Sequence, residues 1–167
     1  MKKILKGIGL ILLLALIAIQ FFHPKKNLTP GNQPNALANV HTIPDDVNVI
    51  LKKACNDCHS NNTVYPWYTK LQPVHWWIDN HIREGKGQFN FDEYSNKRLR
   101  YQYHKLEEVI EEVKSGAMPL DSYTWIHKDA KLTPEEKNKL IGWAEGAIKN
   151  MEAQYPVDSL KRPKQTQ

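Results

Sequence analysis

The only two cysteines of the chain stand three positions apart and directly before a histidine, in the run Cys55-Asn56-Asp57-Cys58-His59. A disulfide between cysteines this close would close only a very small loop, so it would stabilise a fold little. The C-x-x-C-H order is instead typical of haem c attachment, where both thiols bond to the porphyrin and the adjacent imidazole binds the iron. The motif therefore predicts one covalent haem, held by Cys55, Cys58 and His59.

Two other uses of close cysteines fit the rest of the sequence less well. A thioredoxin-like redox pair needs a βαβ context, and no segment here alternates apolar and polar residues as strands do. A zinc site needs four ligands, and the chain has no second cysteine pair to complete one. The sequence therefore favours haem attachment over both.

Residues 4–22 form an apolar run in which Lys6 is the only charged residue. At about 1.5 Å per residue, a helix of this length spans roughly 28 Å, near the thickness of the hydrocarbon core of a bilayer. We therefore predict a single-pass transmembrane anchor in the cytoplasmic membrane, with the haem domain on the periplasmic side. A cleaved signal peptide, favoured by the basic start Met1-Lys2-Lys3, is the alternative.

The net charge of +5 at pH 7 comes from the N-terminus. Residues 1–26 contain five lysines and no acidic residue, so of the 23 basic and 18 acidic residues in the chain, 18 of each remain in residues 27–167. Lysines beside an apolar run suit the headgroup level of a membrane. No basic patch remains for DNA or RNA, so we exclude a nucleic-acid partner.

Composition and periodicity divide the chain into four parts. We expect an anchor or signal segment at 1–22 and, because prolines, asparagines and glycines follow, a tether at 23–43. Residues 44–153 have apolar residues at helical spacing and predict one haem-binding domain. The polar, basic residues 154–167 predict a flexible tail.

Four helices are expected within this domain. The first begins near Pro44 and runs into the cysteine motif, the second begins near Pro73 and stops at Gly85 and Gly87, and the third covers about residues 96–115. The fourth begins with a T-x-x-E capping box, Thr133 to Glu136, and continues to Met151. The predicted fold class is all-α: a cytochrome c-like helical domain around one haem, preceded by a transmembrane helix.

The sixth ligand of the iron is predicted to be Met118. This residue lies in the loop Gly116-Ala117-Met118-Pro119, where a thioether can turn toward the iron, whereas Met151 lies on an apolar helix stripe and is expected to pack in the core. An open position is one alternative, and a histidine is the other, with His127, His104, His81 and His75 as the candidates.

Aromatic residues gather between these landmarks. A haem needs a large flat apolar cover, and indole or phenol groups can also donate to its carboxylates. We expect four of them to contact the haem, with an ordinary place in the core as the alternative: Tyr65, Trp67, Trp76 and Trp77.

Several of these elements together resemble the bacterial haem-binding domain family of small, exported, single-haem proteins. The resemblance covers about residues 44–150 and rests on the CNDCHSNNTVYPWY stretch (55–68), the paired Trp76-Trp77, the Phe89-Asn90-Phe91 stretch and the GAMPL loop (116–120). It implies a c-type haem. The early C-x-x-C-H, the late Met-Pro loop and the C-terminal helix are also broadly similar to class I cytochromes c, from which the YPWY and WW elements depart.

These features predict one-electron transfer at the outer face of the cytoplasmic membrane. Iron bound by both His59 and Met118 has no position left for a substrate, and thioether ligation raises the reduction potential. The expected partners are redox proteins at the membrane, together with the lipid bilayer through residues 4–22. The chain is then a carrier and not an enzyme. The alternatives are a haem-based sensor or ligand-binding module and a peroxidase-like enzyme, which needs an open iron position.

Overall fold

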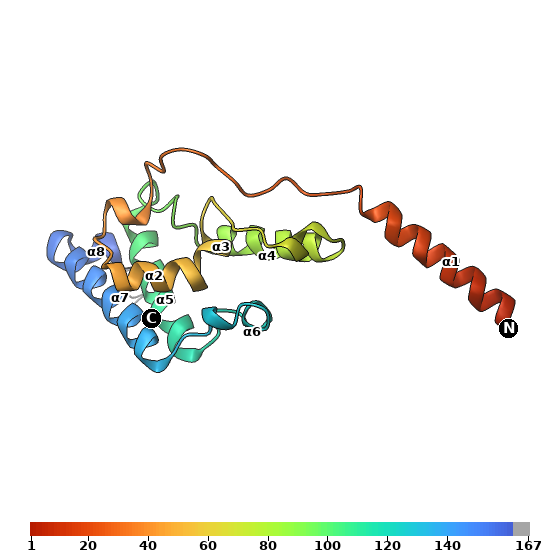
Figure 1. Ribbon diagram of the computed structural model, residues 1–167. Helices are drawn as coiled ribbons and strands as arrows, with labels where there is room; N and C mark the ends of the chain where they lie inside the picture. Colours follow the sequence, from red (N-terminus) through yellow and green to blue (C-terminus); the bar gives the residue numbers. More distant parts are fainter. Residues whose placement is uncertain (162–167) are drawn as a thin grey trace, which may run out of the picture.

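The computed structural model describes residues 1–161, and this part of the chain consists of helices and loops (Figure 1). Two isolated bridges, Leu28 with Asn62 and Asn35 with Glu93, are the β pairing found in it. The all-α prediction is therefore confirmed. The elements in chain order are α1 (Lys2–Ile19), η1 (Leu37–Asn39), α2 (Asp45–Ala54), α3 (Asn56–His59), η2 (Trp67–Lys70), α4 (Val74–Gln88), α5 (Leu99–Ser115), α6 (Asp121–Thr124), η3 (Lys128–Ala130), α7 (Pro134–Gln154) and α8 (Val157–Leu160).

Helix α2 carries the cysteine motif into the domain. It begins after Pro44, with two aspartates in its first turn and two lysines in its last, which is the favourable order of charges for the helix dipole. Its apolar residues, spaced by three and four, are buried. The chain leaves the helix at Cys55 (φ −127°, ψ −44°) and resumes as α3, so the expected single helix through Cys58 is broken in two.

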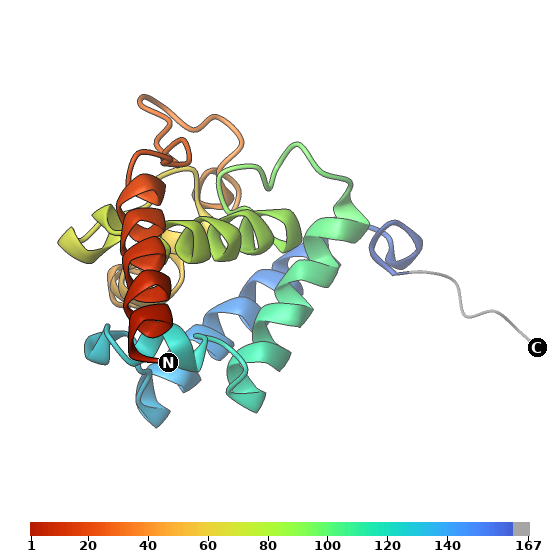
Figure 2. The ribbon, with the colours of Figure 1, turned by 90° about the vertical axis from the view of Figure 1, so that its right-hand side faces the viewer.

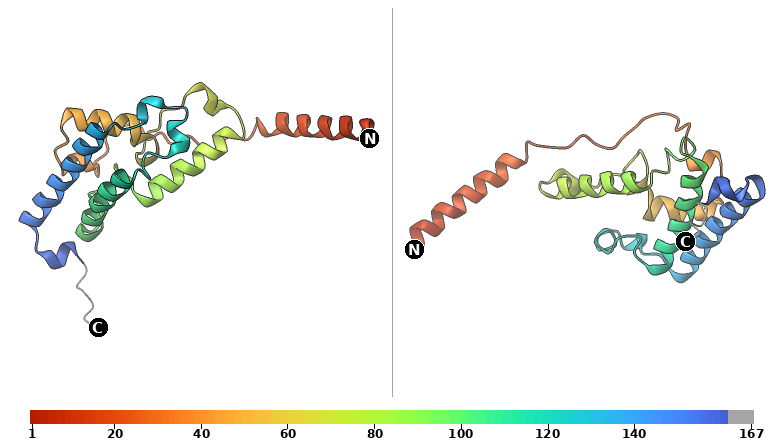
Figure 3. Two further views of the ribbon diagram at one scale, coloured as in Figure 1. Left: turned by 90° about the horizontal axis from the view of Figure 1, so that it is seen from below. Right: turned by 180° about the vertical axis from the view of Figure 1, so that it is seen from behind.

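Helices α5 and α7 pack along each other and lie side by side in Figures 2 and 3. Gly116 ends α5 with φ +82°, a left-handed conformation that favours glycine. Helix α7 begins with the expected capping box, in which Thr133 Oγ1 accepts from the Glu136 N–H (3.2 Å) and Glu136 Oε2 accepts from the Thr133 N–H (2.9 Å). Both helix boundaries are thus set by local chemistry.

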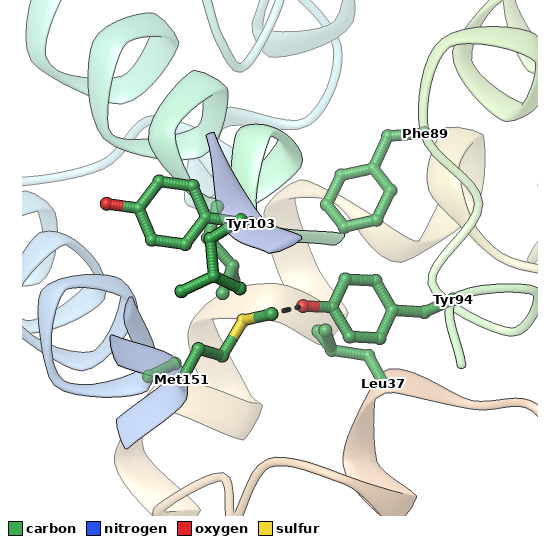
Figure 4. Close-up of a cluster of buried hydrophobic side chains, with 8 residues drawn as sticks. Leu37, Phe89, Tyr94, Tyr103 and Met151 are labelled. Atoms are coloured by element: carbon green, nitrogen blue, oxygen red, sulfur yellow. Dashed lines mark hydrogen bonds between the residues drawn. The ribbon is translucent and has the colours of Figure 1, made fainter. Parts of the chain in front are cut away.

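The core forms two apolar clusters that share partly buried side chains such as Phe91 and Val109. Figure 4 shows the first cluster, where Leu37, Phe89, Tyr94, Tyr103 and Met151 meet. Met151 is 3% exposed, as expected of a packing residue, and its sulfur lies 3.9 Å from the Tyr94 hydroxyl. The second cluster joins the buried face of α2 to α5 and α7, and it forms the walls of the site described below.

The prediction of a transmembrane helix at the N-terminus is wrong. Helix α1 extends away from the other helices (Figures 1 and 3), and none of its residues is buried. It ends at Ile19, and its lysine-free part, residues 7–19, rises only about 20 Å, against about 30 Å of hydrocarbon in a bilayer. No helix within residues 1–161 is long and apolar enough to cross a membrane.

The segment expected to be a free tether instead lies on the domain. The Asn27 side-chain amide donates to Ser60 O (2.8 Å) and to Thr63 Oγ1 (2.9 Å), and the Leu37 side chain is buried in the first cluster. Part of the expected tail is also ordered, because α8 buries Leu160 against the same cluster. The rest of that tail, residues 162–167, lies outside the described residues.

Candidate functional site

Two residues of the cysteine motif and the predicted sixth ligand open into one cavity of about 290 Å³. Cys55, between α2 and α3, and His59, at the end of α3, line it from one side, and Met118 lines it from the loop after α5. Its walls are mainly apolar side chains of α2, α5 and α7, such as Leu51, Val113 and Leu140, together with Phe89 and Phe91. Three polar residues also line it: Gln88, Glu108 and Glu112. We call this space the His59 cavity. Its size is near the lower end of the usual range for small-molecule pockets, about 300–1,000 Å³.

The imidazole of His59 is held in the orientation of a metal ligand. Its Nδ1 lies 2.8 Å from the Phe89 carbonyl oxygen, and because a carbonyl can only accept, Nδ1 carries the proton. The Nε2 atom is then left with a free lone pair, as a metal ligand requires. The ring stacks on Phe91 (5.5 Å between centroids, 20° between planes), and burial lowers the pKa of His59, which keeps the imidazole neutral.

Both cysteines are free thiols held in apolar surroundings. Burial, with Cys58 close by, raises the pKa of Cys55 to about 12, and burial with the neighbouring Asp57 charge raises the pKa of Cys58 to about 11. Such thiols stay protonated at neutral pH, so neither resembles the low-pKa thiolate of a redox or catalytic cysteine. Two free thiols beside a neutral imidazole are the donor set of a covalently attached haem; Cys55 and His59 share the His59 cavity, whereas Cys58 does not line it.

A close approach of two helices fixes the position of α3. At Gly85 of α4, a Cβ atom would lie 2.7 Å from the carbonyl oxygen and 3.0 Å from the Cβ of Cys58. Only glycine allows this approach. The sequence led us to expect that Gly85 and Gly87 end the helix, but α4 continues to Gln88, so Gly85 serves helix packing.

Among the candidates for sixth ligand in the described residues, Met118 alone lines the cavity of His59. His127 is engaged through Nε2 by the Tyr68 hydroxyl (2.5 Å), and His75 through Nδ1 by His23 (3.2 Å). The side chain of His104 is 63% exposed and lies 3.0 Å from Glu108. His81 lies elsewhere, on the second cavity described next.

A second cavity of about 50 Å³, room for one or two water molecules, lies on the other side of α3. It opens between α4 and the segment 120–127, which includes α6; both α4 and α6 lie to the right of α3 in Figure 1. We call it the second cavity and define it by these lining residues: Asp57, Cys58, Tyr68, Trp77, Tyr123 and His127. The two cysteines of the motif thus face different spaces.

None of the four aromatic residues predicted to contact a haem lines the His59 cavity. The Tyr65 hydroxyl accepts from the Asn27 N–H (2.8 Å), and Trp67 is 73% exposed. Trp76 Nε1 donates to Phe22 O (2.9 Å), while Trp77 packs on His81 (4.4 Å between centroids) beside the second cavity.

The aromatic residues that do line the His59 cavity are Phe89 and Phe91. Their order, two phenylalanines separated by one residue directly after a helix, was the available signal. Sequence reasoning did not assign them to the site, because the contact depends on the fold: the Phe91 N–H donates to His59 O at 2.7 Å, which folds this stretch back onto α3.

Comparison with known proteins adds one finding. The model of a family described as a haem-binding domain matches residues 14–146, which is 133 of the 167 residues. The match begins within α1, ends within α7, and includes Cys55, Cys58, His59 and Met118. No curated protein and no solved structure matches the chain, so the broader similarity to class I cytochromes c stays a prediction.

Proposed function

The chain belongs to the haem-binding domain family, and from this premise we propose that it is a c-type electron carrier. In this proposal Cys55 and Cys58 would attach one haem covalently, and His59 and Met118 would bind its iron. When bound, the haem would supply an iron centre that accepts and donates one electron. The chain's own residues attach it, orient it and keep water from it.

The observation that carries the proposal is that His59 and Met118 line one cavity while the His59 Nε2 lone pair is left free. Iron held by a nitrogen and a sulfur ligand has no position for a substrate, which supports electron transfer over catalysis. A thioether ligand favours the ferrous state and so supports a higher potential than a second imidazole would. The apolar side chains that line most of the cavity act in the same direction.

We also propose that the domain works outside the cytoplasm, among exported redox proteins. The support is the N-terminus, where Lys2, Lys3 and Lys6 precede the thirteen lysine-free residues 7–19, an order typical of export segments. A fusion of a periplasm-dependent reporter to the C-terminus tests the location. Activity of the reporter agrees with the proposal, and a silent but intact fusion contradicts it.

Covalent attachment is tested on the full chain, produced in a bacterium that exports it and supplies haem attachment enzymes. Wild type should keep haem through denaturing gel electrophoresis, as revealed by peroxidase staining of the band. The Cys55→Ser/Cys58→Ser double variant should lose all of the stain, because no thioether bond can form. A variant with an unrelated change, Lys114→Ser, controls for expression. An exported wild-type protein without stain would refute the proposed function.

A further inference from the structure

The loop that carries Met118 has few anchors of its own. The Met118 N–H donates to Glu112 O (3.1 Å), and the Ala117 N–H donates to Ser115 Oγ (3.4 Å). Both partners belong to the last turn of α5, so neither bond ties the loop to the helix that carries His59. An axial ligand must be held at a fixed place relative to the iron. Another contact has to supply that restraint.

A direct link to α3 comes from Tyr123, five residues after Met118. Its hydroxyl donates to Asp57 Oδ2 (2.8 Å), while Asp57 Oδ1 accepts from the Val64 N–H (2.9 Å). Burial, reinforced by the Asp57 charge, raises the pKa of Tyr123, so the phenol stays protonated and donates. Asp57 lies inside the cysteine motif and faces the second cavity. The attachment helix α3 and helix α6, which follows the methionine loop directly, are therefore joined by a hydrogen bond to a charged acceptor, which is a strong type.

The ring of Tyr123 is held in turn by two further residues. It stacks on His127, with 4.1 Å between ring centroids and 7° between planes. His127 Nε2 lies 2.5 Å from the hydroxyl of Tyr68, which belongs to η2. Burial raises the pKa of Tyr68, so its phenol stays protonated and shares a hydrogen bond with His127. The contacts thus connect α3, η2 and the segment 121–127 on the side of α3 that faces away from the His59 cavity.

We propose that this network, Asp57–Tyr123–His127–Tyr68, positions Met118 on the haem iron by fixing the methionine loop against the attachment helix. The proposal deepens the proposed function and rests on it, because it requires Met118 as the sixth ligand. None of the four residues lines the His59 cavity, so each is a positioning residue. This network, which lies at the second cavity, then controls how readily the sixth coordination position of the iron opens.

The test uses Tyr123→Phe, which keeps the stacked ring and removes the hydroxyl. Tyr103→Phe is the matched control, because the Tyr103 hydroxyl donates to the Glu152 carboxylate (2.7 Å) between α5 and α7, away from the loop. The measurement is the rate at which imidazole binds to the ferric protein, since Met118 must leave the iron first. Loss of a hydrogen bond to a charged group should raise this rate about tenfold in Tyr123→Phe. The control should react at the wild-type rate.

Two further variants keep the proposal open to refutation. Asp57→Asn keeps an acceptor oxygen without the charge, so the rate of imidazole binding to this variant should fall between the rates for wild type and Tyr123→Phe. If Tyr123→Phe does not fold, Tyr68→Phe takes its place, and we expect a smaller rise in the rate of imidazole binding.

An unchanged rate in Tyr123→Phe, with the wild-type spectrum intact, would overturn the network as a positioning device while leaving the proposed function standing. A rise that is equal in Tyr103→Phe would overturn it as well, because the effect would then be general destabilisation. A wild-type protein without covalent haem would overturn the proposed function itself, and this inference with it.

Discussion

The two cavities on either side of α3 differ in what their polar groups do. In the His59 cavity the imidazole N–H donates a hydrogen bond to a backbone carbonyl and keeps one lone pair free, among mainly apolar side chains. In the second cavity the carboxylate of Asp57, two phenols and one imidazole are bonded or stacked among themselves. A free ligand atom suits binding, whereas mutually satisfied polar groups suit rigidity. We call the side of the motif that faces the His59 cavity the binding side, and the side that faces the second cavity the supporting side.

The difference also explains why the motif has an aspartate between its cysteines. Residues 55 and 59 are four apart and share one side of the helical turn, while residue 57 points away from them. A haem ligated by His59 would fill the first side. Asp57 remains available to bind the segment that follows Met118 in the chain.

The largest effect on the free energy of unfolding is expected where α4 meets α3. In Gly85→Ala the new methyl group would lie 2.7 Å from the Cys58 carbonyl oxygen, so the two helices must move apart at the supporting side. Overpacking of this kind lowers the free energy of unfolding by about 1–3 kcal/mol. Urea unfolding of the haem-loaded protein, followed by circular dichroism, measures it.

Gly87→Ala is the control, two residues further along α4, where a Cβ atom would meet nothing within 4 Å. Alanine favours a helix over glycine, so this variant should be as stable as wild type or more stable by up to about 1 kcal/mol. Equal destabilisation in both variants would show that the Gly85 approach does not hold α4 in place.

A smaller effect on stability is expected between α2 and α7, where Lys53 Nζ lies 2.5 Å from Glu136 Oε1. The hydrogen bond from Lys53 is the main cause that lowers the pKa of Glu136. Because the pKa is lower in the folded chain, this stabilisation is complete above the ordinary value of 4.5 and is lost as the pH falls through the folded value.

Glu136→Gln removes that pH dependence and keeps an oxygen for the Thr133 N–H. At pH 7 we expect the free energy of unfolding of wild type to exceed that of the variant by less than about 1 kcal/mol, since the pair is partly exposed. This difference should disappear on acidification. Thermal unfolding across the acid range measures the difference. If the unfolding temperatures of the two proteins fall in parallel as the pH is lowered, the charge of Glu136 makes no contribution, which would contradict this prediction.

What could be predicted from the sequence was chemistry that is complete within a few residues. The capping box at Thr133 needs only one turn of chain, and it was found as expected; the third helix, expected to end near residue 115, ends at Ser115 before Gly116. The cysteine motif is equally local. The family match supports its reading as a haem site, and the free lone pair of His59 agrees with that reading.

What could not be predicted depends on contacts between distant segments. Gly85 has the local character of a helix stop, but Cys58, 27 positions earlier, makes it a packing residue. Trp76 has the character of a haem cover, yet its indole donates to Phe22 O, more than fifty residues away. The N-terminal run was misjudged for a different reason. Its apolar length was counted through Phe22, whereas the helix ends at Ile19 and begins with lysines.

The central claim is that His59 and Met118 ligate one iron in the cavity that they share. The most direct test is the far-red absorption spectrum of the ferric protein, where sulfur-to-iron coordination gives a weak charge-transfer band. We expect this band in wild type, its loss in Met118→Ala, and its retention in His81→Ala, because the imidazole of His81 lines the second cavity. A Met118→Ala spectrum identical to that of wild type would contradict the claim.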